Sequence, residues 1–182
     1  RLVPNAKKAE SISYHDMIQM AILGAKVLNP RSVELAKLYN IPIHLRSSLN
    51  RNTGTIIKEV SMLERERIIS GVTHEYEVVK MAIFGVPDRP GIARTLFKSF
   101  AEKNINIRMI VQSAAEKEDY NNISFMINME DRDEAEEVLR ANQKEFNAKS
   151  VVVQEDLAMV SIVGAGMMTN PGTAAEMFDV LA

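Results

Sequence analysis

The sequence predicts an α+β fold, in which antiparallel strands carry helices on one face of a sheet. Two observations predict it. Between residues 78 and 156, four short apolar runs with strand-like patterns are interrupted by two longer stretches with helical spacing. Their order is strand, helix, strand, strand, helix, strand, which forms an antiparallel sheet. A related strand-and-helix pattern recurs at 160–182, and two further helices are predicted at 14–40.

Two helices and two short strands are expected in the first 60 residues. Ser13 and Asp16 have the spacing of a capping box ahead of an apolar run, which predicts a helix over about residues 14–23. Asn29 is a good N-cap and Pro30 suits the first helical position, so a second helix begins there. The elements expected next are a helix end at Asn40, strands at 41–48 and 55–58, and a connector at 60–67.

Six elements make up the central module. In the first helix, 92–103, Ile92, Leu96 and Phe100 recur four residues apart, as on one face of an amphipathic helix. The second helix, 131–146, places four residues on one face: Ala135, Val138, Leu139 and Asn142. Strands are expected at 78–86, 105–114, 122–129 and 149–156, and the alternation in 105–114 is typical of a half-buried strand. The order βαββαβ is the ferredoxin-like arrangement, with both helices on one face.

The chain contains an internal repeat. Its first copy is MAIFGVPDRPGIARTLFKSFA (81–101) and its second is VSIVGAGMMTNPGTAAEMFDVLA (160–182). Both combine an apolar strand, a glycine, a short loop, Pro-Gly and a helix whose apolar residues have the same phase. The second copy stops within its helix, so it cannot complete a sheet alone. The strand-like run RIISGVTH (67–74), which has no place in the first module, is a candidate strand for the second.

Composition excludes several classes of function. The net charge of −2 provides no basic field for a nucleic acid, and no apolar run approaches the roughly 18 residues that span a membrane. The absence of cysteine rules out disulfides, zinc–thiolate sites and a cysteine nucleophile. With no visible signal peptide, we expect a cytoplasmic protein. Three scattered histidines, at 15, 44 and 74, predict no metal site, and a chain that starts at Arg indicates a fragment.

The stretch GVPDRPGIART (85–95) contains more proline, glycine and charge than a strand-to-helix turn requires. A helix N-terminus presents unpaired N–H groups and a partial positive charge. The N–H groups of Ile92 and Ala93 can therefore hold a carboxylate or a phosphate. Pro90 fixes φ at the helix start, and Gly91 lets a ligand approach the backbone.

The residues around this turn favour a free α-amino acid over a phosphate. The turn matches neither GxGxxG nor GxxxxGK[ST], and Asp88 would repel a phosphate while attracting an ammonium group. Asn106 and Gln112, on the next predicted strand, add neutral hydrogen-bonding groups. In the alternative, Asp88 only caps the helix and Pro-Gly only shapes the turn. The recurrence of Pro-Gly in the second copy favours the ligand site.

Two motifs resemble the ACT domain, the amino-acid-sensing module of biosynthetic enzymes: GVPDRPGIA and NINIRMIVQ. Other stretches resemble the end of the amino-acid kinase domain of aspartate kinase and its second ACT module: RLVPNAKKAESISYHDM, LGAKVLNPRSVELAKLYNIPIHLRSSLN and SIVGAGMMTNPGTAAEMF. The resemblance covers essentially the whole chain. It implies four segments: the end of the kinase domain at 1–60, a connector with the candidate strand at 61–79, a first ACT domain at 80–155 and an incomplete second one at 156–182.

The family phosphorylates the side-chain carboxylate of aspartate, the first step toward lysine, threonine and methionine. The resemblance implies a regulatory region that binds threonine, lysine or both, forms a homodimer through its ACT modules, and controls a kinase site that uses Mg-ATP in the full enzyme. It implies no catalytic residue, metal or cofactor in this fragment. The effector-binding residues implied are Asp88, Gly91, Ile92, Ala93, Asn106, Ile107, Gln112, Asn121, Asn122, Met167, Thr169, Asn170, Pro171 and Gly172. The implied nucleotide-binding residues are Arg1 and Lys26.

The chain departs from the family pattern at two places. Asn29 stands where the family has His before Pro, and we expect little effect because Asn also caps helices. The family's TTDISF is YNNISF here, so Tyr120, Asn121 and Asn122 replace two threonines and an aspartate. The lost acid favours threonine over lysine, whose ammonium prefers a carboxylate. Two other functions stay open, a stand-alone regulatory subunit and a dimerisation module without an effector.

Overall fold

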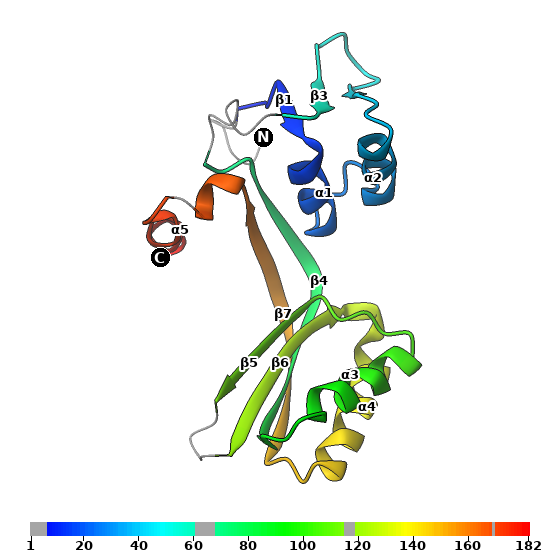
Figure 1. Ribbon diagram of the computed structural model, residues 1–182, viewed down its shortest axis with the longest axis vertical. Helices are drawn as coiled ribbons and strands as arrows, with labels where there is room; N and C mark the ends of the chain where they lie inside the picture. Colours follow the sequence, from blue (N-terminus) through cyan, green and yellow to red (C-terminus); the bar gives the residue numbers. More distant parts are fainter. Residues whose placement is uncertain (1–6, 61–67, 115–118, 169) are drawn as a thin grey trace. The chain divides into compact units, whose positions relative to one another are not determined.

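Two strands are much longer than the others, β4 (Gly71–Pro87) and β7 (Ser150–Val163) (Figure 1). The computed structural model describes residues 7–60, 68–114, 119–168 and 170–182. Contacts divide the chain into unit 1, which is Arg1–His74 with Val160–Ala182, and unit 2, which is Glu75–Met159. Each long strand therefore contributes residues to both units.

Unit 2 is built on a four-stranded sheet with two helices (Figure 1). The strand order is β5–β6–β4–β7, in which β6 runs antiparallel to both β4 and β5. The remaining elements are α3 (Ile92–Glu102), β5 (Met109–Ala114), β6 (Tyr120–Asn128), a short 3-10 turn (Met129–Asp131) and α4 (Arg132–Glu145). The predicted α+β, ferredoxin-like arrangement is confirmed.

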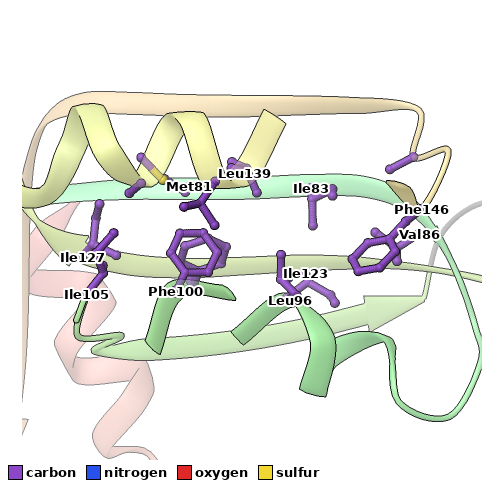
Figure 2. Close-up of a cluster of buried hydrophobic side chains, with 14 of the residues drawn as sticks. Met81, Ile83, Val86, Leu96, Phe100, Ile105, Ile123, Ile127, Leu139 and Phe146 are labelled. Carbon is purple, nitrogen blue, oxygen red and sulfur yellow. The ribbon is translucent and has the colours of Figure 1, made fainter. Parts of the chain in front are cut away.

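The core of unit 2 lies between the sheet and the two helices. Alternate residues of β4 and β6 face the helices, as the period of two in a strand requires: Val79, Met81, Ile83, Ile123, Phe125 and Ile127. Leu96 and Phe100 of α3 and Leu139 of α4 belong to the same cluster (Figure 2). The rings of Phe100 and Phe125 meet edge to face with centroids 5.0 Å apart. All four residues predicted for the inner face of the second helix are buried.

Unit 1 contains a small sheet of order β1–β3–β2. β1 (Ser11–Ser13) runs parallel to β3 (Thr55–Lys58), and β2 (Ile43–Leu45) runs antiparallel to it. Two helices share a core with this sheet, α1 (Tyr14–Ile22) and α2 (Pro30–Leu38). Unit 1 also includes a 3-10 turn (Ala165–Met168) and α5 (Thr173–Leu181). In the described part of the chain, no helix has both the length and the apolar character needed to cross a membrane.

Local side chains explain why α1 and α2 start where the sequence predicts. The Ser13 Oγ accepts a hydrogen bond from the Asp16 N–H at 3.0 Å, and the Asn29 Oδ1 accepts one from the Arg31 N–H at 2.9 Å. The Asp16 carboxylate accepts a hydrogen bond from the Ser70 hydroxyl at 2.8 Å. Both N-caps are thus confirmed, while the buried Asp16 has a partner far away in the sequence.

Several strand boundaries differ from the prediction. The strand expected at 78–86 begins at Gly71, so residues 71–74 of the separate run predicted at 67–74 are the start of β4. The strand expected at 149–156 continues to Val163, and the one expected at 41–48 covers only Ile43–Leu45. β1 was not predicted. Strand length depends on pairing with a neighbour, which periodicity does not report. Most of the predicted connector, residues 61–67, lies outside the described residues.

β5 is an edge strand, and its burial differs from the half-buried strand that was predicted over 105–114. Ile105 and Ile107 do contribute to the core, but they precede the strand. The apolar residues of β5 itself are about half exposed, with Met109 at 45%, Ile110 at 53% and Val111 at 49%. Because β5 ends the sheet, its outer backbone edge is open to another strand.

Candidate functional site

The first Pro-Gly turn connects β4 to α3 and ends at Gly91, the N-cap of the helix. Gly91 has φ 97° and ψ −14°, in the left-handed region that residues with a Cβ rarely adopt. Its carbonyl accepts a hydrogen bond from the Thr95 N–H at 2.9 Å. A Cβ added to Gly91 would meet nothing within 4 Å. The backbone conformation therefore favours glycine here, and the space next to its Cα is open.

The second Pro-Gly turn precedes α5 and has nearly the same geometry. Gly172 has φ 100° and ψ −19° and is the N-cap of α5. Its carbonyl accepts a hydrogen bond from the Glu176 N–H at 3.0 Å, and a Cβ added to it would also meet nothing within 4 Å. The repeat predicted from the sequence is thus confirmed in the backbone of both turns.

Of the two N–H groups predicted to hold the ligand, one is open and one is weakly engaged. The Ile92 N–H donates to the Arg89 carbonyl over a long 3.4 Å, whereas within the described residues the Ala93 N–H has no hydrogen-bond partner. Pro90 carries no N–H. A helix start with an open donor and a partial positive charge can bind an anion. Ile92 contributes to such a site only if it gives up its bond to Arg89.

Asp88 lies in the same turn with its side chain exposed to solvent. Its N–H donates to the Asp119 carbonyl at 2.7 Å. In the part of the chain that the structure describes, its carboxylate has no hydrogen-bond or ion-pair partner. No side chain caps α3, so the alternative in which Asp88 is the cap is wrong. The carboxylate is available to a cation in solvent.

Asn121 and Asn122 lie near the start of β6, between the ends of β4 and β5. Asn121 lies opposite Val86 of β4 and Ala114 of β5. The Asn122 Oδ1 accepts a hydrogen bond from the Gly85 N–H at 3.0 Å, where the register of β4 shifts in a β-bulge. The amide oxygen of Asn122 is therefore engaged in holding the bulge. An aspartate at this position can accept the same bond, so the change from acid to amide preserves this contact.

The predicted effector residues of unit 2 lie in two groups at opposite ends of β5. The first group, at the start of β5, is Asn106 and Ile107; the next residue, Arg108, donates its N–H to the Met126 carbonyl near the end of β6. The second group, at the far end of β5, includes Gln112, Asn121 and Asn122, with the Asp88–Ala93 turn following β4 beside them. Six strand positions separate Arg108 from Ala114, which corresponds to roughly 20 Å.

The predicted residues of the second module belong to unit 1. Met167 is 37% exposed, and Pro171 and Gly172 are exposed. The backbone N–H and the side-chain amide of Asn170 both donate to the Gly166 carbonyl, at 3.1 and 2.8 Å, so this residue stabilises its own loop. Thr169 lies outside the described residues.

The predicted nucleotide-binding residues are Arg1 and Lys26. Lys26 is exposed between α1 and α2, and Arg1 lies outside the described residues. Across the described ranges, no three side chains of metal-binding type gather closely enough to hold an ion.

Hydrogen bonds to Asp133 and then Glu155 raise the pKa of Arg132 above its ordinary value. That arginine is part of an ion-pair network at the start of α4.

The sequence analysis missed a buried ion pair near the start of β5. Glu75 is only 8% exposed and pairs with Arg108, whose Nε also donates to the Asn128 Oδ1 at 2.8 Å. The alternation along the strand could have indicated this pair, because Glu75 is an even number of residues from the inward-facing Val79 and Met81 of β4. An acid at an inward position predicts a partner.

The comparisons identify relatives of the whole chain. A family model for the ACT domain matches residues 82–143. An aspartokinase from Bacillus sp. strain MGA3 is 43% identical over all 182 residues, and the chain spans 44% of that relative's length. The ligand-free regulatory subunit of aspartate kinase from Thermus thermophilus is 30% identical with a TM-score of 0.58, over 64% of this chain and 76% of that one.

A third comparison shows the fold alone. The structure of E. coli aspartokinase III in complex with lysine and aspartate has a TM-score of 0.71 at 22% identity, over all of this chain and 40% of that one.

Proposed function

Because the chain belongs to the aspartate kinase family, we propose that it is the regulatory region of an enzyme that phosphorylates the side-chain carboxylate of L-aspartate with Mg-ATP. In such a reaction the protein contributes mainly positioning and charge neutralisation, and the residues for both are proposed to lie outside this chain. The proposed division is 1–60 for the end of the kinase domain, 61–79 for the connector, 80–155 for the first ACT domain and 156–182 for the start of the second. We place the enzyme in the cytoplasm.

The proposed role of the chain is to bind an end-product amino acid and so control the kinase. The observation that carries this proposal is the turn at 88–93, where an unpaired carboxylate and an open helix N-terminus stand side by side in the sequence. The α-ammonium of an amino acid pairs with Asp88, and its α-carboxylate accepts a hydrogen bond from the Ala93 N–H. The open space above Gly91 leaves room for the ligand.

We propose that the binding site is completed by a second copy of the chain. Asn106 and Ile107 lie about 20 Å by strand rise from the end of β5 where the Asp88–Ala93 turn is found. Antiparallel pairing of two β5 edges brings the start of one β5 next to the end of the other. Such pairing also covers the half-exposed Met109, Ile110 and Val111. The ACT modules therefore form a homodimer in which each site takes residues from both copies.

Threonine is the proposed effector, with lysine as the second candidate. The side chains predicted to surround the ligand include three neutral amides, Asn106, Gln112 and Asn121, which suit a small hydroxyl better than an ammonium group. Asn122 contributes little to this choice, because its amide oxygen is engaged by Gly85. The lysine bound to the E. coli enzyme motivates the second candidate.

A thermal melt of the chain tests the proposal. At a hundredfold excess over Kd, a ligand stabilises the folded state by about 2.7 kcal/mol, which raises the Tm of a chain of this size by roughly 5–10 °C. We expect this shift with threonine and none with Mg-ATP. A shift with lysine alone would identify lysine as the effector. No shift with either amino acid would favour a dimerisation module that binds no effector.

A stand-alone regulatory subunit is the alternative function, because the relative from Thermus thermophilus is itself a regulatory subunit. Residues 7–60 argue against it, since they form a sheet and a core of their own that a pure sensor does not need. The size of the native polypeptide on an immunoblot separates the two. A band from a polypeptide about twice as long as this chain supports the fused enzyme, and a band from a polypeptide of this length supports the subunit.

A further inference from the structure

The loop between α3 and β5 carries Asn106 and Ile107, and it has no regular secondary structure over residues 105–108. Two apolar anchors hold its first part. Ile105 is 5% exposed and its N–H donates to the Phe100 carbonyl at 3.0 Å, while Ile107 packs against the core of unit 2. Asn106 lies between these two anchors and is exposed. The position of its amide therefore depends on how firmly the loop is held on both sides.

A polar cluster holds the other side of the loop. The Arg108 guanidinium pairs through Nη1 with the Glu75 carboxylate of β4 and donates through Nε to the Asn128 Oδ1 of β6 at 2.8 Å. The Arg108 N–H donates to the Met126 carbonyl at 2.8 Å. One residue thus joins the loop to both central strands of the sheet.

The burial of this cluster distinguishes it from the other ion pairs of unit 2. The Glu75 side chain is 9% exposed and that of Arg108 is 28% exposed, whereas the Arg140–Glu136 pair on α4 is 57% and 18% exposed. No second cation pairs with Glu75 among the residues that the structure describes. A buried carboxylate without its partner is strongly unfavourable, so the arginine is fixed by Glu75 rather than free to move in solvent.

We infer that the cluster of Glu75, Arg108 and Asn128 is the positioning element that holds Asn106 and Ile107 ready for the amino acid. This inference rests on the proposed function. The three residues do not touch the ligand in this assignment; they act through the loop backbone. A preformed loop lowers the entropy lost on binding, so the cluster sets affinity as well as stability. A buried polar contact also fixes one geometry, which an apolar contact of equal area does not.

The test compares threonine binding and hydrogen exchange in four variants of the 182-residue chain. Glu75→Gln keeps the size of the side chain and removes its charge. Asn128→Ala removes the contact with the Arg108 Nε, together with a longer bond from the Asn128 amide to Glu130, and keeps the ion pair, so it serves if Glu75→Gln folds poorly. The exchanged pair Glu75→Arg with Arg108→Glu restores opposite charges. Arg140→Gln, which breaks an exposed ion pair on α4, is the matched control.

We expect Glu75→Gln to raise the threonine Kd by about tenfold, equivalent to 1.4 kcal/mol, and to speed amide exchange at residues 105–108. Asn128→Ala should raise Kd by about threefold, the exchanged pair should recover most of the affinity, and the control should change neither quantity. A Glu75→Gln variant with a lower Tm and an unchanged Kd would show a purely structural role and overturn the inference. A wild-type chain that binds no amino acid would overturn the proposed function and this inference with it.

Discussion

Replacing Gly91 by alanine separates two reasons for a glycine at the start of α3. With φ at 97°, an alanine there occupies the left-handed region, at a cost of about 1–2 kcal/mol. Alanine also restricts the unfolded chain, which offsets about 0.4–1 kcal/mol of that cost. No clash adds to the sum, because the new Cβ would meet nothing within 4 Å. Gly91→Ala should therefore lower the free energy of unfolding by only about 1 kcal/mol.

The comparison with Gly85 makes this number testable. Gly85 also has positive φ, 65°, but a Cβ there would lie 2.9 Å from the Cβ of Lys149, so Gly85→Ala must add a clash to the backbone cost. The loss of stability in each variant is measured by urea unfolding. Far-ultraviolet circular dichroism is the probe, because the chain has no tryptophan whose fluorescence could report unfolding. Gly91→Asn should lose less than Gly91→Ala, because asparagine tolerates this region better. An equal loss at positions 85 and 91 would refute the reasoning.

Three further predictions concern the turn, the bulge and the sheet edge. Asp88→Asn should abolish the threonine-induced rise in Tm while changing stability by less than about 0.5 kcal/mol; a retained rise would remove Asp88 from the site. Asn122→Ala leaves the Gly85 N–H without its acceptor and should cost about 1–3 kcal/mol in urea unfolding, whereas Asn122→Asp should cost clearly less; equal losses would contradict the bulge contact. Val111→Lys places a charge on the β5 edge and should convert the proposed dimer to a monomer in light scattering, with weaker threonine binding; a dimer that stays intact would exclude this edge as the interface.

The helices of the central module were predictable because their signals are local. Turn residues set where α3 starts, and four-residue spacing identified its buried residues, Leu96 and Phe100. Strand lengths were not predictable, since β4 and β7 extend as far as they find partners rather than as far as their apolar patterns run.

At the candidate site, the conformation of the turn and the direction of the chain were predictable, whereas the contact made by Asn122 was not. The Asp88 turn follows from Pro-Gly chemistry and has the open donor at Ala93 that the sequence indicated. The separation of Asn106 from this turn follows from chain direction in the sheet, which the element order βαββαβ already contains. The role of Asn122 could not be predicted, because it depends on a bulge in a neighbouring strand.

The two copies of the repeat show where local sequence stops being sufficient. Both glycine turns adopt nearly identical dihedral angles, so the residues of the turn determine where each helix begins. The helices then differ: Phe100 is fully buried in α3, while Leu181, at the matching position of α5, is 60% exposed. Since the apolar residues have the same phase in both copies, the difference lies in the sheet against which each helix can pack. The conformation of the turn is therefore the same whether the helix that follows it is buried or exposed.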